Sequence, residues 1–183
     1  TAGATTAGDV VLLSSQTASN SATISFTSGI DSTYGEYIFK WYNVNPETDN
    51  AEFQFNGSID AGSNYNVTKT TSVFRAYHTE GDASSLGYDT GNDLAQGTGF
   101  QHLIVDVGNG ADESCAGELH LFNPSSTTYA KHFYSMGNIY EGQSGTMQWF
   151  VGGYFNNTDN IDAIQFKMAS GDFDGKIKMW GVK

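Results

Sequence analysis

The chain of 183 residues is short of several residue types, and each shortage excludes a class of protein. Its single cysteine, Cys115, can form neither an intramolecular disulfide nor a thiolate metal cluster, and we expect it to be a small buried apolar residue. Only eight basic residues accompany twenty acidic ones, for a net charge of −12. This charge repels nucleic-acid phosphates and anionic membranes, so no nucleic-acid partner and no membrane insertion are expected.

Long apolar runs, helical periodicity and enzyme motifs are also missing. No apolar run approaches the roughly 18 residues that a membrane-spanning helix needs, and no window of a dozen residues keeps a period of 3.6. Nucleophile elbows, phosphate-binding loops and dinucleotide fingerprints are absent. Glu118 and His120 can share one face of a strand, which is more typical of a solvated face than of an acid–base pair. We therefore predict no catalytic residues and no enzymatic activity.

Short strand-like segments are what the sequence has instead. Twenty-two glycines, only two prolines and many aromatic residues suit strands joined by turns. We predict an all-β fold, an antiparallel β-sandwich of about eleven strands with little or no helix, in a jelly-roll arrangement. Residues 10–183 are expected to form this single domain. Residues 1–9 are expected to be a flexible arm or linker, and the missing initial Met fits either its removal or a piece of a longer protein.

Apolar residues occupy both faces of one segment, residues 34–45. Tyr37 and Phe39 alternate there with Ile38, and the same pattern continues to Val44. Such a strand is buried on both faces or lies at a subunit contact. The tryptophans also lie in strand-like segments, so core packing is expected for Trp41, Trp149 and Trp180.

The candidate ligand-binding residues lie in turns and in the longest segment without strand character, residues 80–99. A segment of this length between strands is typical of a functional loop or of a crossover between sheets. Exposed Tyr side chains can stack on sugar rings, and carboxylates beside them can bind hydroxyl groups. The sequence therefore predicts a surface site that includes Tyr88, Asp89, Asp93 and Tyr140.

We consider two possibilities for a cofactor, none at all or calcium. Two turns, 156–162 and 170–175, gather oxygen ligands and are expected to lie near each other; the weak candidates are Asp159, Asp162, Asp172 and Asp174. Asn, Asp and Gly are also the residues of ordinary turns, which is the interpretation we favour. No metal site is predicted, and Ca²⁺ remains the alternative.

Several long phrases of the sequence resemble a known family, and they cover residues from about 10 to 183. They are LSSQTASNS (residues 13–21), ISFTSGIDSTY, YNVNPETD, FRAYHTEGD, YDTGNDLAQGTGFQ, LFNPSSTTYAKHF and the closing IQFKMASGDFDGKIKMWGV. They are similar to small virion proteins of marine tailed bacteriophages, including phages of cyanobacteria, which are described as structural, tail-fibre-like or lectin-like.

The resemblance implies a non-enzymatic virion surface protein. Two placements remain open: the head domain of a tail fibre or other appendage, or a decoration protein on the capsid. Either would be external on the virion and would contact other virion proteins. A homo-oligomer, with a trimer favoured, and attachment to a host-surface glycan follow from the same resemblance. The alternatives from other classes are a free carbohydrate-binding module and, with less support, a glycan depolymerase.

Overall fold

The computed structural model describes residues 9–141 and 145–183, and within these ranges the chain forms twelve β-strands and no helix. The predicted all-β, antiparallel, two-sheet fold is confirmed, with one strand more than the expected eleven. No helix in the described ranges is long and apolar enough to cross a membrane. Except for Asp9, the arm predicted over residues 1–9 lies outside the described residues.

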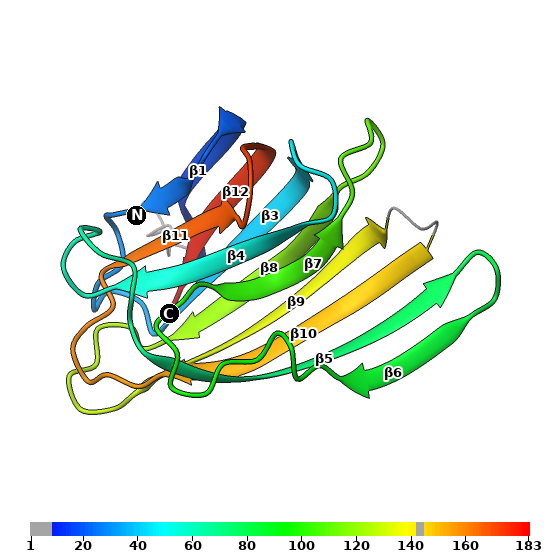
Figure 1. The fold of residues 1–183 in the computed structure, drawn as a ribbon. Helices are drawn as coiled ribbons and strands as arrows, with labels where there is room; N and C mark the ends of the chain where they lie inside the picture. Colours follow the sequence, from blue (N-terminus) through cyan, green and yellow to red (C-terminus); the bar gives the residue numbers. More distant parts are fainter. Residues whose placement is uncertain (1–8, 142–144) are drawn as a thin grey trace, which may run out of the picture.

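Eight strands form a large antiparallel sheet (Figure 1). In spatial order they are β1 (Val10–Ser21), β12 (Phe173–Val182), β3 (Glu36–Pro46), β8 (Cys115–Phe122), β9 (Lys131–Glu141), β10 (Gly145–Phe155), β5 (Lys69–Thr79) and β6 (Ser84–Tyr88). The last of these, β6, is an edge strand that the sequence does not predict. It lies inside the segment taken as a loop, and all five of its residues are exposed.

Four shorter strands form the second sheet, in the order β2 (Ile24–Phe26), β11 (Ala163–Met168), β4 (Ala51–Ser58) and β7 (Gln101–Val107). A single antiparallel pair, Val107 with Glu141, joins it to the large sheet at β9. The small sheet covers one side of the large sheet, while the end formed by β5 and β6 extends beyond it (Figure 1). The jelly-roll connectivity is not confirmed.

The core lies between the two sheets and is made mainly of aromatic rings. Phe39 of β3 and Phe53 of β4 both contact Phe166 of β11, with ring centroids 5.5 and 5.8 Å apart. All three side chains are fully buried. Tyr37, Phe39 and Trp41 of β3 all point into the core. On the opposite face Ile38 is only half-buried and Tyr42 is exposed, so the strand is not buried on both faces within this chain; the alternative, a subunit contact, stays a prediction.

Two glycines lie between the two buried tryptophans of the large sheet. Trp41, Gly117, Gly137 and Trp149 lie directly opposite one another on neighbouring strands, in that order. A Cβ added at Gly117 would lie 2.5 Å from Trp41 Cζ2 and 2.5 Å from the backbone oxygen of Met136. The indole ring thus occupies the side-chain position that Gly117 leaves free. This arrangement requires glycine for a steric reason and not for a turn.

Two buried lysines flank Phe155 on the inner face of the large sheet. Lys69 of β5 and Lys131 of β9 are each opposite Phe155 of β10. The Lys69 Nζ donates hydrogen bonds to the backbone oxygens of Val67 (3.1 Å) and Gly99 (2.6 Å) and has no ion pair with a described carboxylate. Because burial disfavours the charged form, the pKa of Lys69 is lowered to about 7.

Candidate functional site

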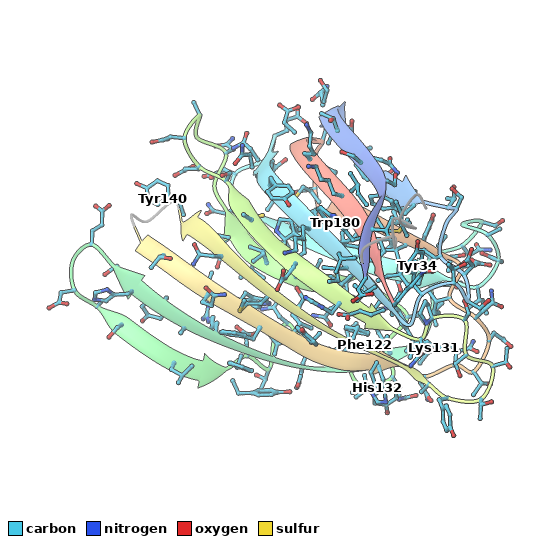
Figure 2. All side chains as sticks on the ribbon, turned by 180° about the vertical axis from the view of Figure 1, so that it is seen from behind. Tyr34, Phe122, Lys131, His132, Tyr140 and Trp180 are labelled. Carbon is cyan, nitrogen blue, oxygen red and sulfur yellow. The ribbon has the colours of Figure 1, made fainter. Side chains whose placement is uncertain are left out.

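The outer face of the large sheet, on the side away from the small sheet, is rich in exposed aromatic and apolar side chains. Outward positions of an exposed sheet are usually polar. Here the exposed large apolar residues at such positions include Leu12, Tyr42, Phe74, Tyr134, Met136 and Tyr140. Figure 2 views the molecule from this side and labels Tyr140 at one end of the sheet and His132 at the other. We call this surface the outer face.

Strand β9 runs through the middle of the outer face and alternates without interruption. Its residues from Lys131 to Tyr140 are buried and exposed in turn. The five exposed side chains are therefore on one face, in the order His132, Tyr134, Met136, Asn138 and Tyr140. These five side chains form a continuous row along the middle of the outer face.

Stacked rings stiffen the outer face on both sides of β9. His120 of β8 lies parallel to Tyr134, with ring centroids 4.5 Å apart, and Phe122 lies 5.8 Å from the same tyrosine. On the other side, Phe74 of β5 stacks on Phe150 of β10 with centroids 4.6 Å apart. Paired rings lose little conformational freedom when a ligand binds, because their rotamers are already restricted.

A hollow of about 380 Å³ separates these two stacks. It lies above Gly152, which is opposite Tyr134 on β9 and opposite Ser72 on β5. A Cβ added at Gly152 would contact only Ser72 Oγ, at 3.7 Å, so the space above it is open. The missing side chain leaves a depression between the aromatic walls formed by Tyr134, Phe74 and Phe150.

A second hollow, of about 370 Å³, lies beside the first and shares Glu118 and Met136 with it. Its charged groups pair with one another: Lys40 Nζ lies 3.1 Å from Glu118 Oε2. His120 Nε2 lies 3.3 Å from Glu118 Oε1, and His120 Nδ1 lies 2.5 Å from Glu36 Oε1. Burial opposes ionisation of Glu118, but hydrogen bonds from Lys40 and His120 outweigh it and lower its pKa.

The spacing of Glu118 and His120 on one strand predicts that they share a face, but it does not predict that Glu36 joins them. Glu36 is distant in sequence and is brought to His120 by the antiparallel pairing of β3 with β8. Two carboxylates therefore contact one imidazole. The sequence has no motif that would assign these carboxylates an acid–base role. Glu36 contacts His120, and Glu118 contacts His120 and Lys40.

The hollow at the His132 end of β9 has a volume of about 630 Å³. Tyr34, Phe122 and Tyr129 supply its aromatic walls, and His132 lines it from β9. Hydroxyl and amide groups from Ser32, Asn123, Ser125 and Ser126 complete the lining. Phe122 and His132 lie near each other in Figure 2.

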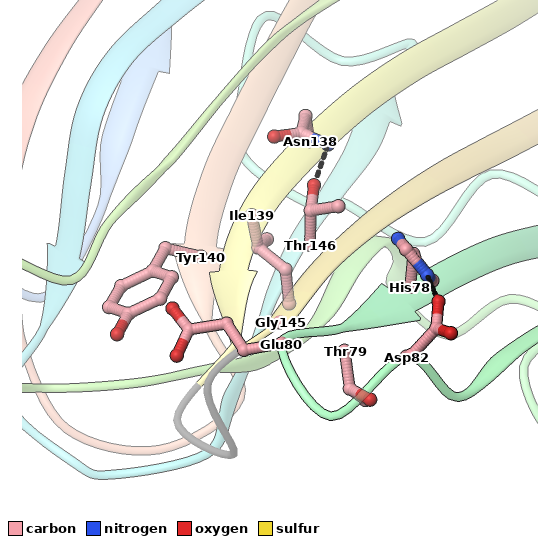
Figure 3. Close-up of a pocket in the computed structure, with 9 residues that line it drawn as sticks. All are labelled: His78, Thr79, Glu80, Asp82, Asn138, Ile139, Tyr140, Gly145 and Thr146. Carbon is pink, nitrogen blue, oxygen red and sulfur yellow. Dashed lines mark hydrogen bonds and ion pairs between the residues drawn. The ribbon is translucent and has the colours of Figure 1, made fainter.

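The hollow at the other end, about 460 Å³, contains Tyr140 (Figure 3). Asn138 donates a hydrogen bond to Thr146 Oγ1 at 2.9 Å, and His78 Nε2 lies 3.1 Å from Asp82 Oδ1. Glu80 lines the same hollow. Asn138 is shared with the neighbouring central hollow, so the two are continuous.

The predicted binding residues are only partly brought together. Tyr140 and Tyr88 are both exposed on the outer face, but Tyr88 is on the edge strand β6, three strands away from β9. The Tyr88 hydroxyl donates to Asp93 Oδ2 at 2.6 Å, and this carboxylate raises the pKa of the phenol. Asp89 instead pairs with Arg75 (3.5 Å) and accepts the backbone N–H of Gly91, so it orders the loop after β6.

The expectation that the two Asp-rich turns lie near each other is wrong. They flank β11 at its opposite ends, and six residues of extended strand separate them by about 20 Å. Asp162 accepts the backbone N–H of Ala61 at 3.0 Å, and Asp174 accepts that of Asn20 at 2.8 Å. Asp159 donates its backbone N–H to Asn157 Oδ1 within its own turn, and Asp172 donates its backbone N–H to Glu47 Oε2, which is distant in sequence. No cluster of three or more metal-binding side chains is found in residues 9–141 and 145–183.

Several outer-face residues escape the sequence analysis, and one prediction about the core is wrong. Trp41 and Trp149 are buried as expected, but Trp180 is a partly exposed outer-face residue of β12, with Lys178 Nζ 5.9 Å from its ring. The walls of the hollows at Phe74, Tyr134 and Phe150 were not singled out. The signal that could have found them is the one recognised in residues 34–45: apolar residues at both alternating positions, here in β9 and β10.

Comparison with known proteins adds no identification, because no protein-family model, curated protein or solved structure matches the chain.

Proposed function

We propose that this chain is a non-enzymatic recognition domain of a bacteriophage virion surface protein and that its outer face binds a host-surface saccharide. The observation that carries the proposal is the open hollow above Gly152, between the aromatic walls of Tyr134, Phe74 and Phe150. Sugar rings present C–H faces that pack on aromatic rings and hydroxyl groups that bind amides and carboxylates. The outer face supplies both kinds of group.

The placement on a virion rests on the resemblance of the sequence to phage virion proteins. The tail-fibre or appendage head is the placement most consistent with a recognition face, and the capsid decoration protein is the other. A homo-oligomer, with a trimer favoured, belongs to the same proposal. A free carbohydrate-binding module would use the same face, and it is distinguished by its absence from purified particles.

Filling the hollow without removing any side chain gives the sharpest test. Gly152→Val places a branched side chain in open space on an exposed strand, where valine suits the backbone. Gly87→Val is the matched control: it is also a strand glycine with nothing within 4 Å of an added Cβ, and it is on β6, outside the hollows. Both variants should unfold at temperatures close to that of the unmodified chain.

Binding is measured on a panel of immobilised polysaccharides, neutral (β-1,3-glucan, β-1,4-glucan, α-mannan and galactan) and acidic (alginate and hyaluronan). The unmodified chain and Gly87→Val should bind at least one of them, and Gly152→Val should bind at least about tenfold more weakly. Retention of no polysaccharide by the unmodified chain, or equal retention by Gly152→Val, would contradict the saccharide proposal. Release of reducing ends from the bound polysaccharide would overturn its non-enzymatic part.

Placement on the virion is tested separately by mass spectrometry of purified phage particles. The chain should be present at many copies per particle, and a particle reconstruction should locate it on the tail or on the shell. Absence from purified particles would contradict the virion placement and would favour a free carbohydrate-binding module. Light scattering of the purified chain measures whether it forms the expected trimer.

A further inference from the structure

The four hollows of the outer face lie one after another along β9. His132 lines the first, Tyr134 the hollow above Gly152, Met136 both central hollows, and Asn138 and Tyr140 the last. The two central hollows share Glu118 and Met136, and the last two share Asn138. His132, in the first hollow, is one outward position before Tyr134 on β9. From His132 to Tyr140 the strand rises about 26 Å. A ligand that contacts all four hollows is therefore elongated and parallel to β9.

The charge on this groove argues against a polyanion. Its most central charged groups neutralise one another, since Lys40 pairs with Glu118 and His120 lies between Glu118 and Glu36. At the Tyr140 end the groove carries Glu80 and Asp82, and the whole chain has a net charge of −12. Anionic sugars would be repelled along the length of the groove, whereas uncharged rings would meet aromatic, amide and hydroxyl groups.

On the basis of the proposed function, we infer that the ligand is an internal stretch of a linear, neutral polysaccharide that lies along β9. The hollow above Gly152 would hold a central ring. The Tyr34–Phe122–His132 hollow and the Tyr140 hollow would each hold a ring nearer one end. Binding strength should then accumulate with chain length, because each added ring occupies a further hollow without a new loss of translational freedom.

A ladder of oligosaccharides tests this inference. The chain is titrated calorimetrically with β-1,3-glucan, β-1,4-glucan, α-mannan and galactan oligomers, from the disaccharide to the octasaccharide. For the sugar that binds, the octasaccharide should bind more than about tenfold more tightly than the disaccharide. Tyr140→Ala and Phe122→Ala, at opposite ends, should each weaken octasaccharide binding about fivefold and leave disaccharide binding unchanged.

The controls are on the same face but outside the groove. Leu86→Ala removes an exposed apolar side chain of β6, and Tyr88→Ala removes an exposed ring from the same strand. Both should leave the affinity for the octasaccharide unchanged. Equal affinity for short and long oligomers, or tighter binding of alginate or hyaluronan than of neutral chains, would overturn the inference while leaving a saccharide-binding function in place. If no saccharide binds at all, the proposed function itself fails.

Discussion

Tyr134 lies parallel to His120 on the outer face, with 4.5 Å between ring centroids and 12° between ring planes. The imidazole is held in turn by Glu36 at Nδ1 and by Glu118 at Nε2. A ring on the groove is thus positioned through a chain of contacts that reaches across β9, β8 and β3. The orientation of Tyr134 is set before any ligand arrives.

Two substitutions of Tyr134 distinguish the contribution of its ring to binding from that of its hydroxyl group. Tyr134→Phe keeps the stack on His120 and should retain affinity for the bound polysaccharide within about twofold. Tyr134→Ala removes the wall of the hollow and should weaken binding about tenfold, because one aromatic contact is lost. Isothermal titration calorimetry measures both. Equal loss in the two variants would show that the hydroxyl group, and not the ring, makes the contact.

The ion pairs of Glu118 predict a pH-dependent effect of Glu118→Gln. The folded-state pKa of Glu118 is lowered below 4.5, so its contribution is present above pH 4.5 and is lost as the pH falls through the folded-state value. The variant should be less stable by about 1 kcal/mol at pH 7, because the pairs with Lys40 and His120 are partly exposed. Urea unfolding at pH 7 and at pH 3 measures the difference. It should shrink as the pH falls below 4.5, and a difference that is as large at pH 3 as at pH 7 would contradict the ionic origin.

Because Lys69 is buried, we expect it to make the folded chain more stable as the solution becomes mildly alkaline. Its folded-state pKa is about 7 and its ordinary value is 10.5, so between these values the unfolded chain binds a proton that the folded chain does not. The contribution of Lys69 to the free energy of unfolding therefore increases with pH in that window, by about 4 kcal/mol from pH 7 to pH 10.

Lys69→Met is the variant that isolates this effect. It removes the titrating group and leaves the other lysines and tyrosines in place. The stability of the unmodified chain minus that of the variant should increase as the pH is raised from 7 to 10, whatever its sign at pH 7. Denaturant unfolding at three pH values provides the comparison. Parallel pH curves for the two proteins would show that Lys69 titrates normally.

The steric need for glycine at position 117 predicts a destabilised core. In Gly117→Ala the new methyl group would meet Trp41 Cζ2 and a backbone oxygen, and neither can move away easily. Overpacking of this kind should reduce the free energy of unfolding by about 3 kcal/mol. Gly87→Ala, where the added Cβ meets nothing within 4 Å, should change it by less than about 0.5 kcal/mol. A shift in tryptophan fluorescence of Gly117→Ala alone would locate the change at the indole.

The fold was predictable because period-two alternation is a local property of the chain. Tyr37 and Phe39 occupy alternate positions of residues 34–45, and both side chains are fully buried in the structure. Strand β6 was not predictable in the same way. An edge strand with every residue exposed has no buried positions to mark it, and pairing with β5 is the one feature that identifies it.

The candidate site was harder to predict, because it depends on which strands become neighbours. Tyr140 and Tyr88 were chosen as tyrosines in turn-like or loop-like segments, and both are exposed. Gly152, Tyr134 and Phe74 lie on three strands whose adjacency follows from the order of the sheet, and nothing local shows that a glycine is opposite a tyrosine. The distance between the two Asp-rich turns also depends on the arrangement of the strands, which the local sequence does not show.

Because β9 alternates strictly, its inward and outward side chains have different surroundings. The inward set is locked by the packing of the core, whereas the outward set contacts little besides its neighbours on the sheet. Substitutions at the five outward positions can therefore change the surface without a rearrangement of the core. Under the proposed function, such a domain could follow a changing host receptor over evolutionary time, because variation of the outer face is uncoupled from folding.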